Sequence, residues 1–191
     1  MRKVGTESQR TYHQKTVNGF FNKYMWGIGL DVGYAGYTEG CLPILPTAVG
    51  VDINFPGYDG KILPFPAQSQ NYVYSSHCLE HIDNYKQAIQ EWYRVTKIKG
   101  YVITVVPHQF LYEKKLEKPS FYNEDHKRFY TPAKLLKEFE EALEPNTYRV
   151  RLLEDGDDFF DYDRFPTEHS TGQYEITLVI QRIKPPVWDL A

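Results

Sequence analysis

Acidic, small and imidazole side chains follow the short apolar runs in the first half of this 191-residue chain. Asp31 and Gly33 lie at the end of the first run, Asp52 at the end of the second, and Ser76 and His77 at the end of the third. A carboxylate accepts hydrogen bonds from paired hydroxyl groups, glycine lets the backbone approach a ligand, and histidine transfers protons near neutral pH. This order of residue types predicts a site that holds a small molecule and moves a proton.

The apolar runs have the length and composition of strands, and segments with helical spacing alternate with them. We expect strands at 29–32, 48–53, 71–76, 101–106, 148–153 and 174–183. We expect helices at 10–25, interrupted near Gly19, at 78–96 and at 131–143. In the last of these, Thr131 is the N-cap and Pro132 occupies the first helical position. The alternation predicts one α/β domain over residues 1–191, with a mostly parallel sheet, helices on both faces and an antiparallel last strand. In such sheets ligands bind beyond the carboxyl ends of the strands, which is where the candidate residues stand.

Six blocks of sequence occur in a fixed order from Gly29 to Leu135. They are GLDVGYAG at 29–36, VGVDI at 49–53, DGKILPFP at 59–66, SSHCLEHI at 75–82, EWYRVTKIKGYVITVVP at 91–107 and EDHKRFYTPAKL at 124–135. Together they resemble the motifs of class I S-adenosylmethionine-dependent methyltransferases, in particular the type 11 subfamily. The resemblance implies a Rossmann-like fold and S-adenosyl-L-methionine as the cofactor.

The resemblance also implies a role for individual residues of the cofactor site. The backbone at Gly33 and Ala35 would approach the methionine end, and Ser76 and His77 would lie near the sulfonium. The remaining positions are Asp52 for the ribose hydroxyls, Asp59 for the adenine amino group, Leu63 or Phe65 for the adenine face, and Asp31, Tyr34, Ile53 and Gly60 as further lining residues.

Three histidines are candidates for the base that removes a proton from the methyl acceptor. His77 and His108 each follow a predicted strand, and His126 precedes the cap at Thr131. We expect one of them to take the proton and the others to position the substrate. His81 is expected instead to orient or cap the start of the helix. The segment 1–28 is expected to form either a lid over the cofactor or a helix that simply covers the sheet.

The N-terminal half departs from the family pattern. Ala35 stands where the first motif usually has its second glycine, and only fifteen residues separate Gly36 from Asp52. A full-length helix does not fit between the first two strands, and the stretch after Asn54 is too short for the usual second helix. We therefore expect a trimmed form of the fold.

Two other functions fit parts of the same pattern. A glycine turn followed by an acid about 20 residues later is also typical of nicotinamide-dependent oxidoreductases, although Ala35 and Thr38 occupy two of the expected glycine positions. A non-catalytic binding or scaffold protein would keep the fold with an imperfect glycine motif. Methyl transfer to a small-molecule acceptor, at oxygen or nitrogen, is the preferred interpretation, with a sugar or another polar or anionic metabolite as the acceptor.

Composition restricts the classes of binding partner that we expect for this chain. The net charge of −3 argues against a large nucleic-acid interface, and no apolar segment has the length of a membrane span. The two cysteines, Cys41 and Cys78, form no disulfide framework, so we expect a cytoplasmic protein.

The aspartates between 155 and 163 lack the spacing of a calcium loop, and we expect no metal site. A lysine- and arginine-containing stretch at 114–137 is expected to be a solvated face or to receive an anionic substrate. The oligomeric state is left open.

Overall fold

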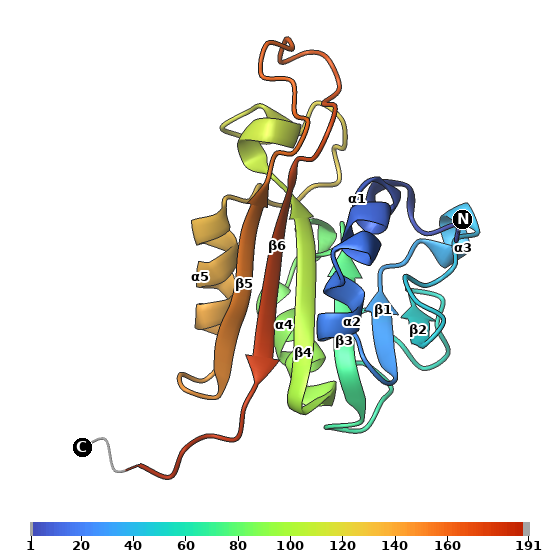
Figure 1. Ribbon diagram of the computed structural model, residues 1–191, viewed down its shortest axis with the longest axis vertical. Coiled ribbons are helices and arrows are strands. Elements are labelled where there is room, and N and C mark those ends of the chain that lie inside the picture. The colour runs from blue at the N-terminus through green and yellow to red at the C-terminus, as the bar shows by residue number, and fades with distance from the viewer. Residues whose placement is uncertain (1, 189–191) are drawn as a thin grey trace.

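The computed structural model describes residues 2–188, so Met1 and residues 189–191 of the predicted domain lie outside the described residues. Six strands form one sheet in the order β2-β1-β3-β4-β6-β5 (Figure 1). These strands are β1 (Gly29–Val32), β2 (Ala48–Val51), β3 (Gln70–Ser76), β4 (Thr96–Pro107), β5 (Tyr148–Gly156) and β6 (Glu175–Arg182). The first four pair in parallel, and β6 runs antiparallel between β4 and β5. The predicted Rossmann-like, mostly parallel sheet with an antiparallel last strand is confirmed.

Helices cover both faces of the sheet (Figure 1). They are α1 (Thr6–Val17), α2 (Phe20–Tyr24), the short α3 (Gly36–Glu39), α4 (Tyr85–Val95) and α5 (Pro132–Ala142). On one face Trp92 of α4 and Phe139 of α5 pack with Val102 of β4 in the larger core. On the other face Phe20 of α2 packs with Ile103 of β4, the next residue along the strand. Because side chains alternate along a strand, β4 supplies both cores, which fixes its position at the centre of the molecule.

The trimmed half is visible in the connections around β2. Only the four-residue α3 lies between β1 and β2, and the chain from β2 to β3 contains no helix. β2 is therefore the outer strand of the sheet on this side. The cofactor motifs of this half lie in loops and turns rather than against a full second layer of helices.

Two segments differ from the sequence expectations. The predicted helix at 78–96 is a 3₁₀ turn, η1 (Leu79–His81), followed by α4, because the Asn84 side chain accepts a hydrogen bond from the Gln87 N–H at 3.2 Å and starts a new helix. A π-helical turn, η2 (Gln109–Glu113), follows β4 and was not expected. Within the predicted helix 10–25, the chain breaks at Gly19 between α1 and α2, and Thr131 caps α5 as predicted.

No helix in the described range 2–188 is both long enough and apolar enough to cross a membrane.

Candidate functional site

Two adjoining cavities open at the carboxyl ends of β1, β2 and β3. The first has a volume of about 350 Å³ and lies under the N-terminus of α1; the second, about 380 Å³, lies over β2 and the loop after it. Both are lined by Gly33, Ala35, His77 and His81, so these residues form the boundary between them. Most of the predicted site residues line one or both cavities. They are Asp31, Gly33, Tyr34, Ala35, Ser76, His77 and His126 in the first, and Gly33, Ala35, Asp52, Ile53, Gly60 and His77 in the second.

The turn after β1 brings the backbone into this boundary. Gly33 has a φ of +77°, and a Cβ at this position would lie 2.5 Å from the Cys78 sulfur, so only glycine fits. Ala35 also has a positive φ, +58°. The ring of Tyr34 packs where a side chain at Gly50 would be, which explains the glycine of the VGVDI block. The turn therefore presents backbone rather than side chains to a ligand.

Asp31, the last acid before this turn, is buried in the wall of the first cavity. Its carboxylate accepts a hydrogen bond from the Ile44 backbone N–H at 2.6 Å. Burial raises the pKa of Asp31 to about 7, although the Ile44 hydrogen bond opposes the shift. A cationic group entering the cavity would favour the ionised form.

Asp52 and Asp59 differ in their position relative to the second cavity. Asp52 lines the second cavity with one oxygen bound to the Ile53 N–H at 2.7 Å, which leaves its other oxygen for a ligand. Asp59 lies outside both cavity linings, in a turn where it accepts hydrogen bonds from the N–H groups of Lys61 and Ile62. These hydrogen bonds lower the pKa of Asp59, and its neighbour Gly60 is the residue that reaches the cavity.

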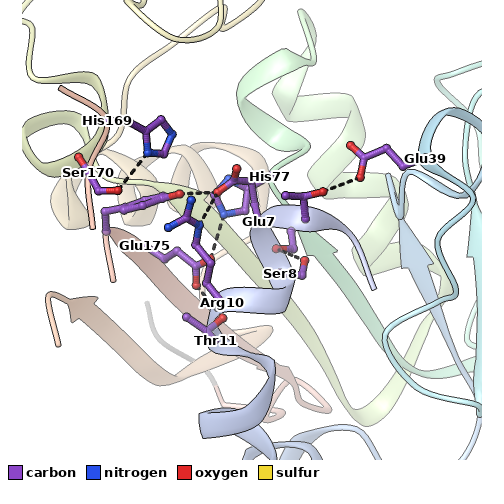
Figure 2. Close-up of polar contacts among 12 residues, drawn as sticks. Glu7, Ser8, Arg10, Thr11, Glu39, His77, His169, Ser170 and Glu175 are labelled. Atoms are coloured by element: carbon purple, nitrogen blue, oxygen red, sulfur yellow. Dashed lines mark hydrogen bonds and ion pairs between the residues drawn. The ribbon is translucent and has the colours of Figure 1, made fainter. Parts of the chain in front are cut away.

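His77 is held in place by a buried acid from β6. Its Nε2 lies 3.0 Å from Oε1 of Glu175, and the other oxygen of Glu175 accepts a hydrogen bond from Thr11 (Figure 2). That second oxygen also lies 3.3 Å from the Lys15 ammonium. Burial acts to lower the pKa of His77, but the hydrogen bond and charge of Glu175 outweigh it and raise that pKa. Burial acts in the opposite sense on Glu175, where Lys15 and His77 prevail and lower the pKa to about 2.

Helix α1 is fixed to the sheet and closes the first cavity. The Ser8 hydroxyl donates to the Ser76 hydroxyl at 2.9 Å, and the Thr6 hydroxyl donates to Glu39 at 3.0 Å (Figure 2). Glu7 accepts a hydrogen bond from the Tyr174 hydroxyl. In the structure this segment is therefore a wall of the site, bound through several of its side chains.

The far side of the first cavity carries Glu80, His81 and His126. His126 is buried, with Nδ1 2.5 Å from Oε1 of Glu113. Its ring packs edge-on against the ring of His81, with centroids 4.8 Å apart. Burial, together with the nearby His126, lowers the pKa of His81 to about 4.

His108 lies outside both cavities. Its Nδ1 accepts hydrogen bonds from the N–H groups of Phe110 and Leu111, and its Nε2 lies 3.5 Å from Asp155. The imidazole thus caps the η2 turn. This arrangement does not bring His108 together with His77 and His126.

Sequence reasoning gave no site role to Glu7, Glu80 or Glu175 and a structural role to His81. Glu80 and His81 stand in the same SSHCLEHI block as His77, so the position directly after a strand was the available signal. Glu7 lines the first cavity and Glu175 lies behind His77, and nothing in local spacing indicates that residues 168 positions apart approach the same site.

A family model of the methyltransferase domain, type 11, matches residues 32–104. This range contains the turn after β1, Asp52, His77 and the η1 turn, each of which contributes residues to one or both cavities. The part of the chain that builds the site therefore resembles a methyltransferase domain of type 11. The prediction of a class I S-adenosylmethionine-dependent methyltransferase is thereby confirmed.

Solved structures share the fold of this methyltransferase. S-adenosylmethionine-dependent methyltransferases from Aquifex aeolicus and Archaeoglobus fulgidus superimpose with a TM-score of 0.57 each, at 13% and 15% identity. The first alignment covers 94% of both chains, and the second covers 91% of this chain and 94% of the other. One from Thermotoga maritima gives a TM-score of 0.56 at 18% identity, covering 92% of this chain and 91% of that one. A search of curated protein sequences finds no match.

The lysines and arginine of the basic stretch and the aspartates of the acidic loop line neither cavity of the methyltransferase. In the basic stretch, the ammonium groups of Lys114, Lys115 and Lys134 bond backbone carbonyls and line neither cavity. In the acidic loop, Asp157 accepts from Tyr162 and Asp158 from Gln14, both at exposed positions.

Proposed function

We propose that the methyltransferase holds the adenosine part of S-adenosylmethionine in the second cavity and its methyl acceptor in the first. The observation that carries this proposal is the shared boundary of the two cavities at Gly33, Ala35 and His77. A methyl group at that boundary would face the first cavity. Once bound, the cofactor supplies an electrophilic methyl group on a positively charged sulfur.

The residues around the second cavity fit the nucleoside end of the cofactor. Asp52 has a free carboxylate oxygen for ribose hydroxyls, and Ile53, Gly60 and Tyr58 offer apolar and backbone surface for a base. The turn at Gly33 admits the chain close to the methionine end. Asp31 is placed to pair with the ammonium group of that end, because its buried carboxylate has a single hydrogen-bond donor.

His77 is the proposed base for the acceptor. It lines both cavities, and Glu175 fixes its ring through Nε2. A histidine oriented by a carboxylate can take a proton as the methyl group is transferred. His126 is engaged by Glu113, and His108 caps η2, so His77 is the predicted histidine best placed for this role.

The charge of the first cavity favours a neutral or cationic acceptor. The described residues that line it include four carboxyl side chains, those of Glu7, Asp31, Glu39 and Glu80. They include no lysine and no arginine. This lining disfavours the anionic metabolite considered from the sequence. The proposed acceptor is a small polar molecule with a hydroxyl or amino group, such as a neutral sugar or an amine.

The test is methyl transfer from isotopically labelled S-adenosylmethionine to a panel of neutral polyols, amines and phosphorylated or carboxylated analogues. We expect transfer to a neutral or amine member and little to the anionic ones. His77→Asn is the informative variant, because His77 has a φ of +50° and asparagine tolerates that conformation. It should lower turnover about 100-fold or more while S-adenosylhomocysteine still binds.

His13→Ala, which changes an exposed histidine on α1, serves as the control. Turnover by His77→Asn equal to that of the control would refute the role of His77. Transfer confined to anionic acceptors would refute the assignment of the acceptor class.

A further inference from the structure

Three side chains on the wall of the first cavity have the types and spacing of metal ligands. One ligand atom from each of Glu80, His81 and His126 lies within 4.8 Å of the others. Glu80 and His81 belong to the η1 turn, and His126 comes from the loop before α5, so segments 45 residues apart converge here. All three residues line the cavity, which leaves their common centre open to a ligand.

The carboxylate of Glu80 is the most unusual group of this cluster. Glu80 is completely buried, and among residues 2–188 neither of its carboxylate oxygens has a hydrogen-bond partner other than its own backbone N–H. The nearest cationic candidate is Nδ1 of His77, at 3.7 Å. A buried carboxylate without partners is costly, and native proteins normally pair it with a cation or a metal. Among the described residues, the compensation of Glu80 is thus this long contact to His77, an imidazole that Glu175 engages more closely.

The two histidines are oriented by groups behind them. Nδ1 of His126 is held by Glu113, so Nε2 is the nitrogen left for a ligand. Glu113 is itself fully buried, and its other oxygen has no hydrogen-bond partner. His81 forms a hydrogen bond with the backbone of Asp125, which occupies one of its nitrogens as well. A carboxylate or carbonyl behind each imidazole is the usual support of metal-bound histidines, because it fixes the ring and the tautomer.

We infer that Glu80, His81 and His126 bind a divalent transition-metal ion in the first cavity, with Glu113 as a positioning residue. Two imidazoles and one carboxylate are typical of zinc sites and also suit manganese, cobalt and iron, whereas magnesium and calcium prefer oxygen ligands alone. From the sequence we expected no metal site, because the one local cluster of acidic residues, at 155–163, lacks the spacing of a metal-binding loop.

Three protein ligands leave coordination positions free toward the cavity. A hydroxyl oxygen of an acceptor could occupy one of them, and the metal would lower the pKa of that hydroxyl. This role of the metal rests on the proposed function. The binding of the metal itself does not.

The experiment is calorimetric titration of the tag-free, chelator-stripped protein with zinc chloride, with magnesium chloride as the comparison. We expect one zinc ion per chain and no competition from magnesium. Glu113→Gln should weaken zinc binding about 10- to 100-fold, and Glu80→Gln should weaken it by more than that. His13→Ala removes an exposed imidazole far from the cluster and should leave the affinity unchanged.

The same variants separate metal binding from folding. Glu80→Gln replaces an unpartnered buried charge with a neutral group of the same shape, so without metal its melting temperature should equal or exceed that of the wild type. Zinc should raise the melting temperature of the wild type and of His13→Ala, but not of Glu80→Gln. His81→Ala, at a half-buried position, provides a second ligand variant if Glu80→Gln does not fold.

Zinc binding that is absent, or equal in the wild type and the ligand variants, would overturn the site. Failure of methyl transfer with intact zinc binding would count against the proposed function alone. Transfer that is unchanged after zinc is removed would leave the site in place but refute its role toward the acceptor.

Discussion

The buried carboxyl of Asp31 should make cofactor binding and protein stability respond to pH in opposite directions. Asp31 is 5% exposed and has one hydrogen-bond donor, the Ile44 N–H. Burial raises the pKa of this carboxyl from 3.8 to about 7, so the empty protein holds a proton on Asp31 through most of the acidic range. The perturbation is the Asp31→Asn variant, studied from pH 4 to pH 8.

The sign for stability follows from proton uptake. Between pH 4 and pH 7 the folded protein binds one more proton at Asp31 than the unfolded chain does, so the free energy of unfolding falls as the pH rises. Each unit of pKa difference corresponds to about 1.4 kcal/mol, which gives a loss of about 4 kcal/mol over the interval. Asp31→Asn lacks this contribution. The variant should therefore gain stability relative to the wild type as the pH rises, and most of the gain should be present by pH 7.

The affinity for the cofactor should change with pH in the opposite direction to the stability. In the proposed binding mode the ionised carboxylate pairs with the ammonium group of the cofactor. Affinity for S-adenosylhomocysteine should then be full above pH 7 and fall about tenfold per pH unit below it. Asp31→Asn should bind weakly and without this dependence. Calorimetry with S-adenosylhomocysteine measures the affinity, and urea unfolding measures the stability, both in the presence of a chelator. Parallel pH profiles of affinity for the wild type and the variant would refute the reasoning.

Three further substitutions test how the site and the fold are built, each checked by urea unfolding. Gly33→Ala should destabilise the fold by more than the ~1–2 kcal/mol of Gly19→Ala, because both positions have positive φ but only Gly33 faces the Cys78 sulfur. Of the two variants, only Gly33→Ala should also weaken S-adenosylhomocysteine binding. Equal effects of the two variants would contradict a clash with Cys78. Thr131→Ala should cost about 1 kcal/mol through loss of the helix cap, and no change would mean that the cap contributes little. Trp92→Ala, in the larger core, should cost about 3–5 kcal/mol, and a loss below 1 kcal/mol would show that the core refills the space.

The parts of the site that lie at strand ends could be predicted from the sequence. Asp31, Asp52 and Ser76 each stand at or directly after the end of a strand, and parallel strands place their carboxyl ends along one edge. The positive φ at Gly33 likewise follows from its residue type in a turn. Local order and strand topology were sufficient for these residues.

The rest of the site depends on contacts that local patterns do not encode. Helix α1 reaches the sheet through Thr11 and Lys15, whose partner Glu175 lies at least 160 residues away. The role of His108 as a cap depends on the η2 turn, and apolar spacing gave no sign of that turn. His126 and Glu113 meet across a loop with no regular periodicity. In each case tertiary packing, rather than propensity, decides where the side chain points.

The buried acids of the methyltransferase differ in how they are compensated, and the difference separates structure from function. Glu175 has Thr11, Lys15 and His77 around it and holds elements of the fold together. Asp31 has a single backbone donor and Glu80 none outside its own residue, and both face the first cavity. A buried charge with so little compensation weakens the folded state, and it is tolerated where a ligand supplies a further partner. Replacing either acid by its amide should therefore leave folding intact but weaken the binding of one ligand. For Asp31 that ligand is the cofactor, through its ammonium group, and for Glu80 it is the metal ion.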